Sequence, residues 1–201
     1  MKKILPFFSY LLHPLFIPVL STLYFFLLDE NFLVPAEKYL ILIQVVIITI
    51  LIPISFYFLL RSLGKINSVM AKEINERKAP LFLQMVLLYL LIRNNIVFDS
   101  VPELYYFFLC AMMSLFAALV FVFLKVKVSL HMMGMGGFLF FIIGLGIHNE
   151  TNFTYTIAAW FVITGFVATS RLEMGAHNLK ELGVGFLTGM LPQMAMWYFW
   201  L

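Results

Sequence analysis

The sequence predicts an all-α, polytopic transmembrane helix bundle that forms one integral membrane domain over residues 1–201. Of the 201 residues, 63% are hydrophobic and only 11% are charged. A soluble domain carries about 45–50% apolar and about 25% charged residues. A globule of this size cannot bury such an apolar excess, because much of its surface stays exposed. The long apolar segments of the chain therefore indicate that lipid is its solvent.

About seven segments are apolar enough to be membrane-spanning helices, because a span needs about 20 apolar residues. We expect these helices at residues 6–28, 39–60, 81–98, 104–124, 130–147, 153–169 and 182–201. The first segment is longer than the core of a secretory signal, which has about 7–15 residues, and no small-x-small cleavage site follows it. We interpret it as a retained helix, with six spans as the alternative if its two internal prolines prevent it from crossing.

The basic residues fall almost entirely on one side of the predicted bundle. The N-terminus and the loops at 61–80, 125–129 and 170–181 carry 11 of the 13 lysine and arginine residues. Because short cytoplasmic loops are enriched in these residues, we expect this side and the N-terminus to be cytoplasmic in a multi-pass protein of the cell (inner) membrane. The net charge of +3 is spread over the loops, without the basic tract that a nucleic-acid partner would require.

Three polar clusters lie beside predicted span ends on this side, at residues 72–80, 129–131 and 170–181. Guanidinium and ammonium groups suit phosphate oxygens, and arginine binds them in a bidentate manner. Among the residues of these clusters, Lys72, Arg77, Lys78 and Arg171 supply such groups. This composition indicates an anion site, although basic residues beside spans also determine topology.

Two histidines in these clusters suggest nucleophilic chemistry. His177 and Glu181 are four residues apart, a spacing that places both side chains on one face of a helix. The carboxylate could then hold one ring nitrogen and leave the other free to attack. His131 could protonate the leaving oxygen. As alternatives, the pair could be an ordinary surface pair, His131 a packing residue and Ser129 only an N-cap.

The third cluster resembles the final motif of the type 2 phosphatidic acid phosphatase superfamily. That motif reads Ser-Arg, five residues, His, three residues, Asp. Here Ser170-Arg171, five residues, His177, three residues and Glu181 reproduce the spacing, with glutamate in place of aspartate. The motif is fairly specific, and the resemblance extends over roughly residues 65–190.

The other two motifs of the family are matched in part and in the same order. Its middle motif, Pro-Ser-Gly-His, corresponds to residues 128–131, which keep Ser129 and His131. Its first motif, Lys, six residues, Arg-Pro, corresponds to Lys72, six residues and Ala79-Pro80. The arginine of that motif is missing, and Arg77 and Lys78 lie just upstream as substitutes.

The resemblance implies a metal-independent phosphatase that hydrolyses phosphomonoesters or diphosphates of membrane lipids and uses no cofactor. His177 would attack phosphorus and form a phosphohistidine, His131 would be the general acid, and Glu181 would orient His177. The phosphate oxygens would be held by Lys72, Arg171 and Ser129, with Arg77 as a looser candidate. The partners implied are a lipid phosphate and the bilayer itself.

A catalytically inactive scaffold or a small transporter of the same fold is the alternative. Transporters usually carry ionisable residues within their spans, and here Arg93 alone of the Lys, Arg, Asp and Glu residues lies in one. Metal-dependent lipid transfer uses clustered aspartates to hold Mg²⁺, whereas Asp29 and Asp99 are far apart. His13 and His148 have no charged partner nearby in the sequence, and we interpret both as structural.

Overall fold

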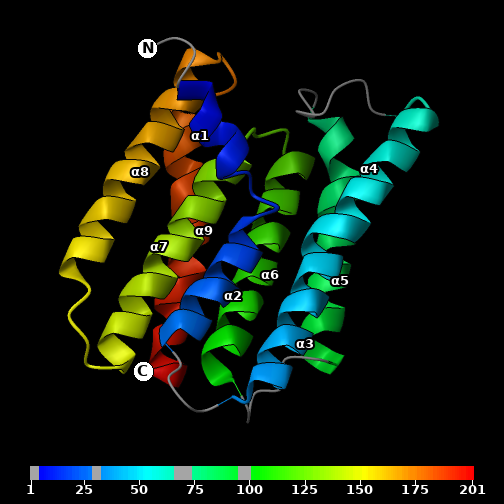
Figure 1. The fold of residues 1–201 in the computed structure, drawn as a ribbon. Helices are drawn as coiled ribbons and strands as arrows, with labels where there is room; N and C mark the ends of the chain where they lie inside the picture. Colours follow the sequence, from blue (N-terminus) through cyan, green and yellow to red (C-terminus); the bar gives the residue numbers. More distant parts are fainter. Residues whose placement is uncertain (1–4, 29–32, 66–73, 95–100) are drawn as a thin grey trace. The chain divides into compact units, whose positions relative to one another are not determined.

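The computed structural model describes residues 5–28, 33–65, 74–94 and 101–201, and all regular elements within these ranges are helices (Figure 1). The all-α prediction is confirmed for them. The chain divides into two compact units, Met1–Ile17 with Val128–Leu201, and Pro18–Lys127.

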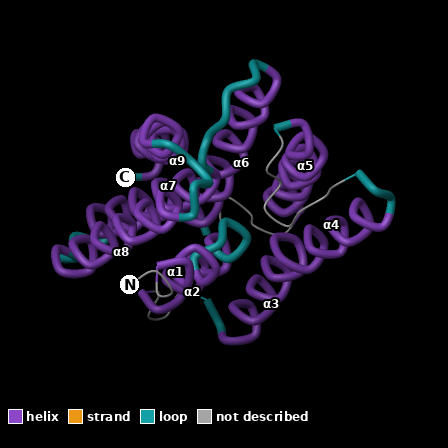
Figure 2. The backbone as a smooth tube through the Cα atoms, turned by 90° about the horizontal axis from the view of Figure 1, so that it is seen from above, coloured by secondary structure: helices purple, strands orange, loops and turns teal. Residues whose placement is uncertain are grey.

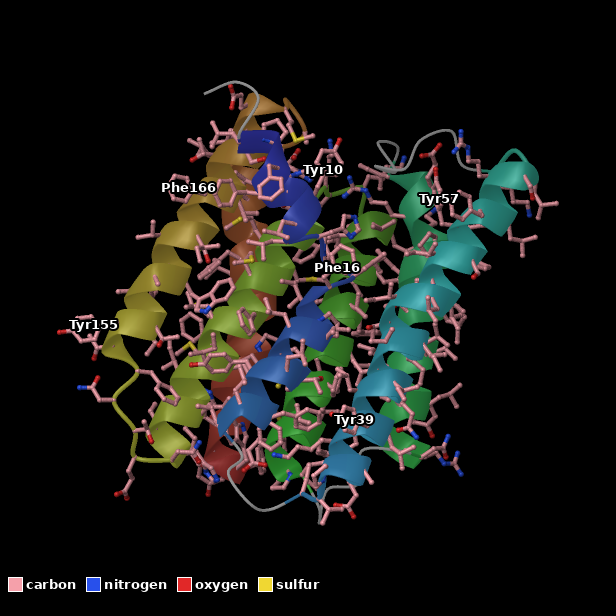
Figure 3. The ribbon with its side chains drawn as sticks, in the orientation of Figure 1. Tyr10, Phe16, Tyr39, Tyr57, Tyr155 and Phe166 are labelled. Carbon is pink, nitrogen blue, oxygen red and sulfur yellow. The ribbon has the colours of Figure 1, made fainter. Side chains whose placement is uncertain are left out.

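The first unit is built from three long helices and one short helix. These are α1 (Leu5–Leu11), α7 (Leu130–His148), α8 (Thr154–Glu173) and α9 (Leu179–Trp200). Helix α7 lies between α8 and α9 (Figure 2). Helix α1 packs on α8, where the ring of Phe8 stacks on Phe166 with 5.0 Å between centroids. Tyr155 of α8 is 90% exposed and points away from the unit in Figure 3, as expected for a side chain that contacts lipid.

Helices α7 and α9 run parallel and approach very closely. The N–H of Ser129 donates to the carbonyl of Glu181 at 3.1 Å. One turn further along α9, Gly185 lies against the backbone of Ser129, and Gly189 lies against the carbonyl of Met133. A Cβ atom at either glycine would overlap these backbone atoms. Small residues allow such close approach between helices in lipid, so the two glycines fix the register of α9 on α7.

The second unit contains the remaining helices. They are α2 (Ile17–Leu28), α3 (Pro35–Val46), the π-helical turn η1 (Ile47–Leu51), α4 (Ile52–Ser62), the 3₁₀ turn η2 (Asn75–Arg77), α5 (Lys78–Asn94) and α6 (Pro102–Phe123). The π turn directly precedes Pro53, whose ring would clash with a carbonyl one turn earlier in a regular helix. The ammonium of Lys78 lies 5.2 Å from the ring centroid of Phe123, which joins α5 to α6.

Four helical segments among the described residues are long and apolar enough to cross a bilayer. They are Pro35–Ser62, Pro102–Phe123, Leu130–His148 and Thr154–Glu173. These segments correspond to the predicted spans 39–60, 104–124, 130–147 and 153–169, which supports the prediction of a membrane protein. By this measure the prediction of about seven spans, or of six, is wrong.

The other three predicted spans fall short of this measure for different reasons. Segment 6–28 is broken between Leu11 and Ile17, because Pro14 cannot continue α1. Segment 81–98 is described only as far as Asn94, and the helix described there, α5, carries Lys78 and Arg93 near its two ends. Segment 182–201 lies in the 22-residue helix α9, in which Pro192, Gln193 and the aromatic last turn lower the mean hydropathy.

The close contact between α7 and α9 predicts that an added methyl group at this interface destabilises the protein. Gly189→Ala should lower the free energy of unfolding by about 1–3 kcal/mol, because the new methyl group overlaps the Met133 carbonyl. Gly183→Ala is the matched control on the same helix, since no atom lies within 4 Å of its added Cβ. Denaturant titration in detergent, followed by circular dichroism, measures both variants. Equal midpoints for the two variants would contradict the packing described here.

Candidate active site

A tight turn between α8 and α9 places His177. Gly175 follows the end of α8 with φ +60°, the left-handed conformation that ends many helices and favours glycine. Asn178 then caps α9, and its side-chain oxygen accepts the N–H of Glu181 at 2.9 Å. The left-handed glycine and the N-cap reverse the chain within a few residues. His177, which lies in this turn, is therefore next to the end of α8 and the start of α9.

His177 is held by Glu181. Its Nδ1 lies 2.7 Å from Oε2 of the carboxylate, and the two side chains are 3% and 21% exposed. Because a carboxylate accepts hydrogen bonds, Nδ1 carries the hydrogen and, in the neutral ring, Nε2 carries the lone pair. The contact was predicted from the spacing, but His177 precedes the N-cap and does not share a helix face with Glu181. The capping turn, and not the helix repeat, brings the two together.

His131 lies in the first turn of α7 and contacts the first segment of the chain. Its Nε2 is 3.0 Å from the carbonyl oxygen of Ser9. A carbonyl only accepts, so Nε2 carries the hydrogen. The ring of His13 meets His131 edge-on, with 5.2 Å between centroids. Arg171 and His177 also lie near the His131 ring.

Arg171 is buried at the end of α8, where only 4% of it is exposed. Its Nη1 lies 3.8 Å from Sδ of Met174. The preceding residue, Ser170, is also buried, and its hydroxyl oxygen is 2.6 Å from that of Ser9. A guanidinium that is kept from water interacts more strongly with an anion than an exposed one does. This end of the first unit therefore combines a buried cation with two histidines.

Ser129 has a structural part in this arrangement. It is the N-cap of α7, and its hydroxyl accepts the N–H of Met132 at 3.4 Å. The interpretation of Ser129 as an N-cap is therefore confirmed. The first unit brings together five of the seven predicted site residues, namely His131, His177, Glu181, Arg171 and Ser129.

The remaining two predicted site residues lie elsewhere. Arg77 belongs to the second unit, where it ends η2 and is 8% exposed. Lys72 lies outside the described residues. Within the part of the chain that the structure describes, no three or more His, Cys, Asp or Glu side chains are arranged to hold a metal ion.

Ser9 and His13 are site neighbours that the sequence reasoning did not assign. His13 was interpreted as structural, yet it contacts His131, and its Nδ1 accepts the N–H of Leu15 at 3.3 Å. The sequence does carry a signal for these two residues. They are polar side chains, four residues apart, within an apolar segment that also contains Pro14. Polar groups in such segments often mark functional sites.

Comparisons with family models, with curated proteins and with solved structures give no match. The function is therefore inferred from the geometry of the site and from its sequence motifs.

The contact between α1 and α8 can be tested by cross-linking. Ser9→Cys combined with Ser170→Cys, in a Cys110→Ala background, should form an intramolecular disulfide on mild oxidation, because the two hydroxyl oxygens are 2.6 Å apart. Thiol alkylation and mass spectrometry measure the yield. The control is Ser9→Cys with Thr164→Cys, which moves the second thiol about 9 Å along α8. Similar yields for the two pairs would show that α1 is not docked as described.

Proposed function

We propose that the protein is a metal-independent membrane lipid phosphatase, which hydrolyses a phosphomonoester or diphosphate through a phosphohistidine. The observation that carries the proposal is the 2.7 Å contact between Nδ1 of His177 and Glu181, beside the buried Arg171. A histidine oriented by a carboxylate is an activated nucleophile. The resemblance of residues 170–181 to the final motif of the type 2 phosphatidic acid phosphatases supports the same chemistry.

The first half of the proposed reaction transfers the phosphoryl group to the protein. Nε2 of His177 attacks phosphorus, so that a P–N bond forms while the P–O bond to the lipid breaks. His131 gives a proton to the leaving lipid oxygen. Glu181 stabilises the positive charge that develops on the His177 ring.

The second half regenerates the protein. Water attacks phosphorus and loses a proton to His131, the P–N bond breaks, and inorganic phosphate leaves. Arg171 balances the charge on the phosphoryl oxygens in both halves. The N-terminus of α7 contributes the positive end of its dipole.

The proposed substrate is a lipid phosphate because of where the residues lie along the chain. His131 is in the first turn of a helix that can span the bilayer, and Arg171 is in the last turn of another. Both helix ends suit the depth of lipid headgroups, so a phosphate attached to a lipid can reach them without leaving the bilayer.

Activity measurements test this proposal directly. The purified protein should release phosphate from lipid phosphates in the presence of EDTA. His177→Gln should abolish release, and His131→Gln should reduce it by about 10²–10⁴-fold. His148→Gln is the matched control, because His148 lies at the opposite end of α7, 5.5 Å from the ring of Trp200. Release that requires Mg²⁺ would contradict the mechanism, and no release from any lipid phosphate would favour the inactive scaffold.

We also propose that the site faces the cytoplasm. The support is the distribution of charge within the first unit, whose lysine and arginine residues all fall in the N-terminus or beside the turn between α8 and α9, at Lys2, Lys3, Arg171 and Lys180. Such residues favour the cytoplasmic face. Helix α9 runs parallel to α7, so the C-terminus lies at the end of the unit away from His131. Alkaline phosphatase fused after Leu201 should therefore be active and green fluorescent protein dark. The reverse pattern would place the site outside.

A further inference from the structure

The break after α1 gives Ser9 a carbonyl that can bind a side chain. Pro14 has no N–H, and its ring does not fit a continuing helix, so α1 ends at Leu11. The last four carbonyls of any α-helix have no donor within that helix. Ser9 is among these four residues, and its carbonyl accepts the Nε2–H of His131 at 3.0 Å.

The side chain of Ser9 fixes this carbonyl in place. Its hydroxyl oxygen is 2.6 Å from that of Ser170 on α8, and the two residues are 1% and 0% exposed. The neighbouring Phe8 stacks on Phe166 of the same helix, with an angle of 18° between the rings. Two consecutive residues of α1 are therefore anchored on α8, so the carbonyl of Ser9 has little freedom to turn away from His131.

We propose that Ser9 is a positioning residue for His131. Its carbonyl holds the Nε2–H form of the ring, so that Nδ1 is the nitrogen that exchanges the proton with the leaving oxygen. In the protonated ring both nitrogens carry hydrogen. The Nδ1 proton goes to the lipid oxygen as the P–O bond breaks, Nε2–H stays on the Ser9 carbonyl, and Nδ1 later takes a proton from the attacking water.

The two histidines would then work through opposite ring nitrogens. Glu181 binds Nδ1 of His177, and Nε2 is the nitrogen that would attack phosphorus. Ser9 occupies Nε2 of His131 and leaves Nδ1 for proton transfer. The role of Ser9 in turnover rests on the proposed phosphatase function. The tautomer of His131 does not depend on that function, so the tautomer and the function are tested separately.

The tautomer is tested without any activity measurement. The full chain is labelled with ¹⁵N-histidine in nanodiscs, and His131 is assigned by comparison with the His131→Gln variant. Long-range ¹H–¹⁵N correlation at a pH where the ring is neutral should show hydrogen on Nε2. Hydrogen on Nδ1, or an even mixture of the two forms, would overturn the proposal even if the protein hydrolyses lipid phosphates.

The Ser9 hydroxyl is tested by turnover. Ser9→Ala and Ser170→Ala remove the same hydrogen bond, so each should lower kcat about 3–10-fold with KM unchanged. The double variant should be no slower than either single variant, and Ser9→Thr should restore much of the rate. Ser114→Ala is the control, because that buried hydroxyl binds the carbonyl of Cys110 within its own helix. Wild-type kcat in Ser9→Ala would overturn the proposal.

The oxidised Ser9→Cys/Ser170→Cys protein tests whether the docked α1 segment positions His131 or blocks the site. A disulfide keeps the segment docked and the carbonyl of residue 9 in place. The cross-linked form should turn over at a rate similar to that of its reduced form. If oxidation abolishes turnover and a reductant restores it, α1 must leave the site for catalysis, and the proposal is wrong.

Discussion

The close parallel packing of α7 on α9 is the constraint on which the site depends. Lipid provides no hydrophobic force that drives helices together, so van der Waals packing between close backbones must hold them. Gly185 and Gly189 allow this approach, and the N–H of Ser129 binds the carbonyl of Glu181. A larger side chain at either glycine would separate the start of α7 from the start of α9, and with it His131 from His177.

Parallel packing also has an electrostatic consequence. The N-termini of α7 and α9 lie at the same end of the first unit, where each contributes partial positive charge from its first N–H groups. Arg171, at the end of the antiparallel helix α8, adds a full charge at that end. The C-terminus of α8 would by itself favour cations, so this helix end stabilises the guanidinium, and the cluster as a whole favours an anion.

Hydropathy predicted the helical class and four of the spans because those segments are long and uniformly apolar. It failed where a local feature overrides the average, as at Pro14, which divides 6–28, and in α9, which carries Gln193 in its interior. The contact of His177 with Glu181 could be predicted from spacing and charge. The contacts of Ser9 and His13 could not, because they join residues more than a hundred positions apart and depend on how α1 packs on α8.

The most direct test of the proposed phosphatase function is to trap its phosphohistidine intermediate. The protein is mixed with a ³²P-labelled lipid phosphate in EDTA, quenched within milliseconds in alkali, and digested for mass spectrometry. The proposed mechanism predicts label that is stable in alkali, labile in acid and attached to His177, and none in His177→Gln. Lipid phosphate hydrolysis without any labelled histidine would contradict it.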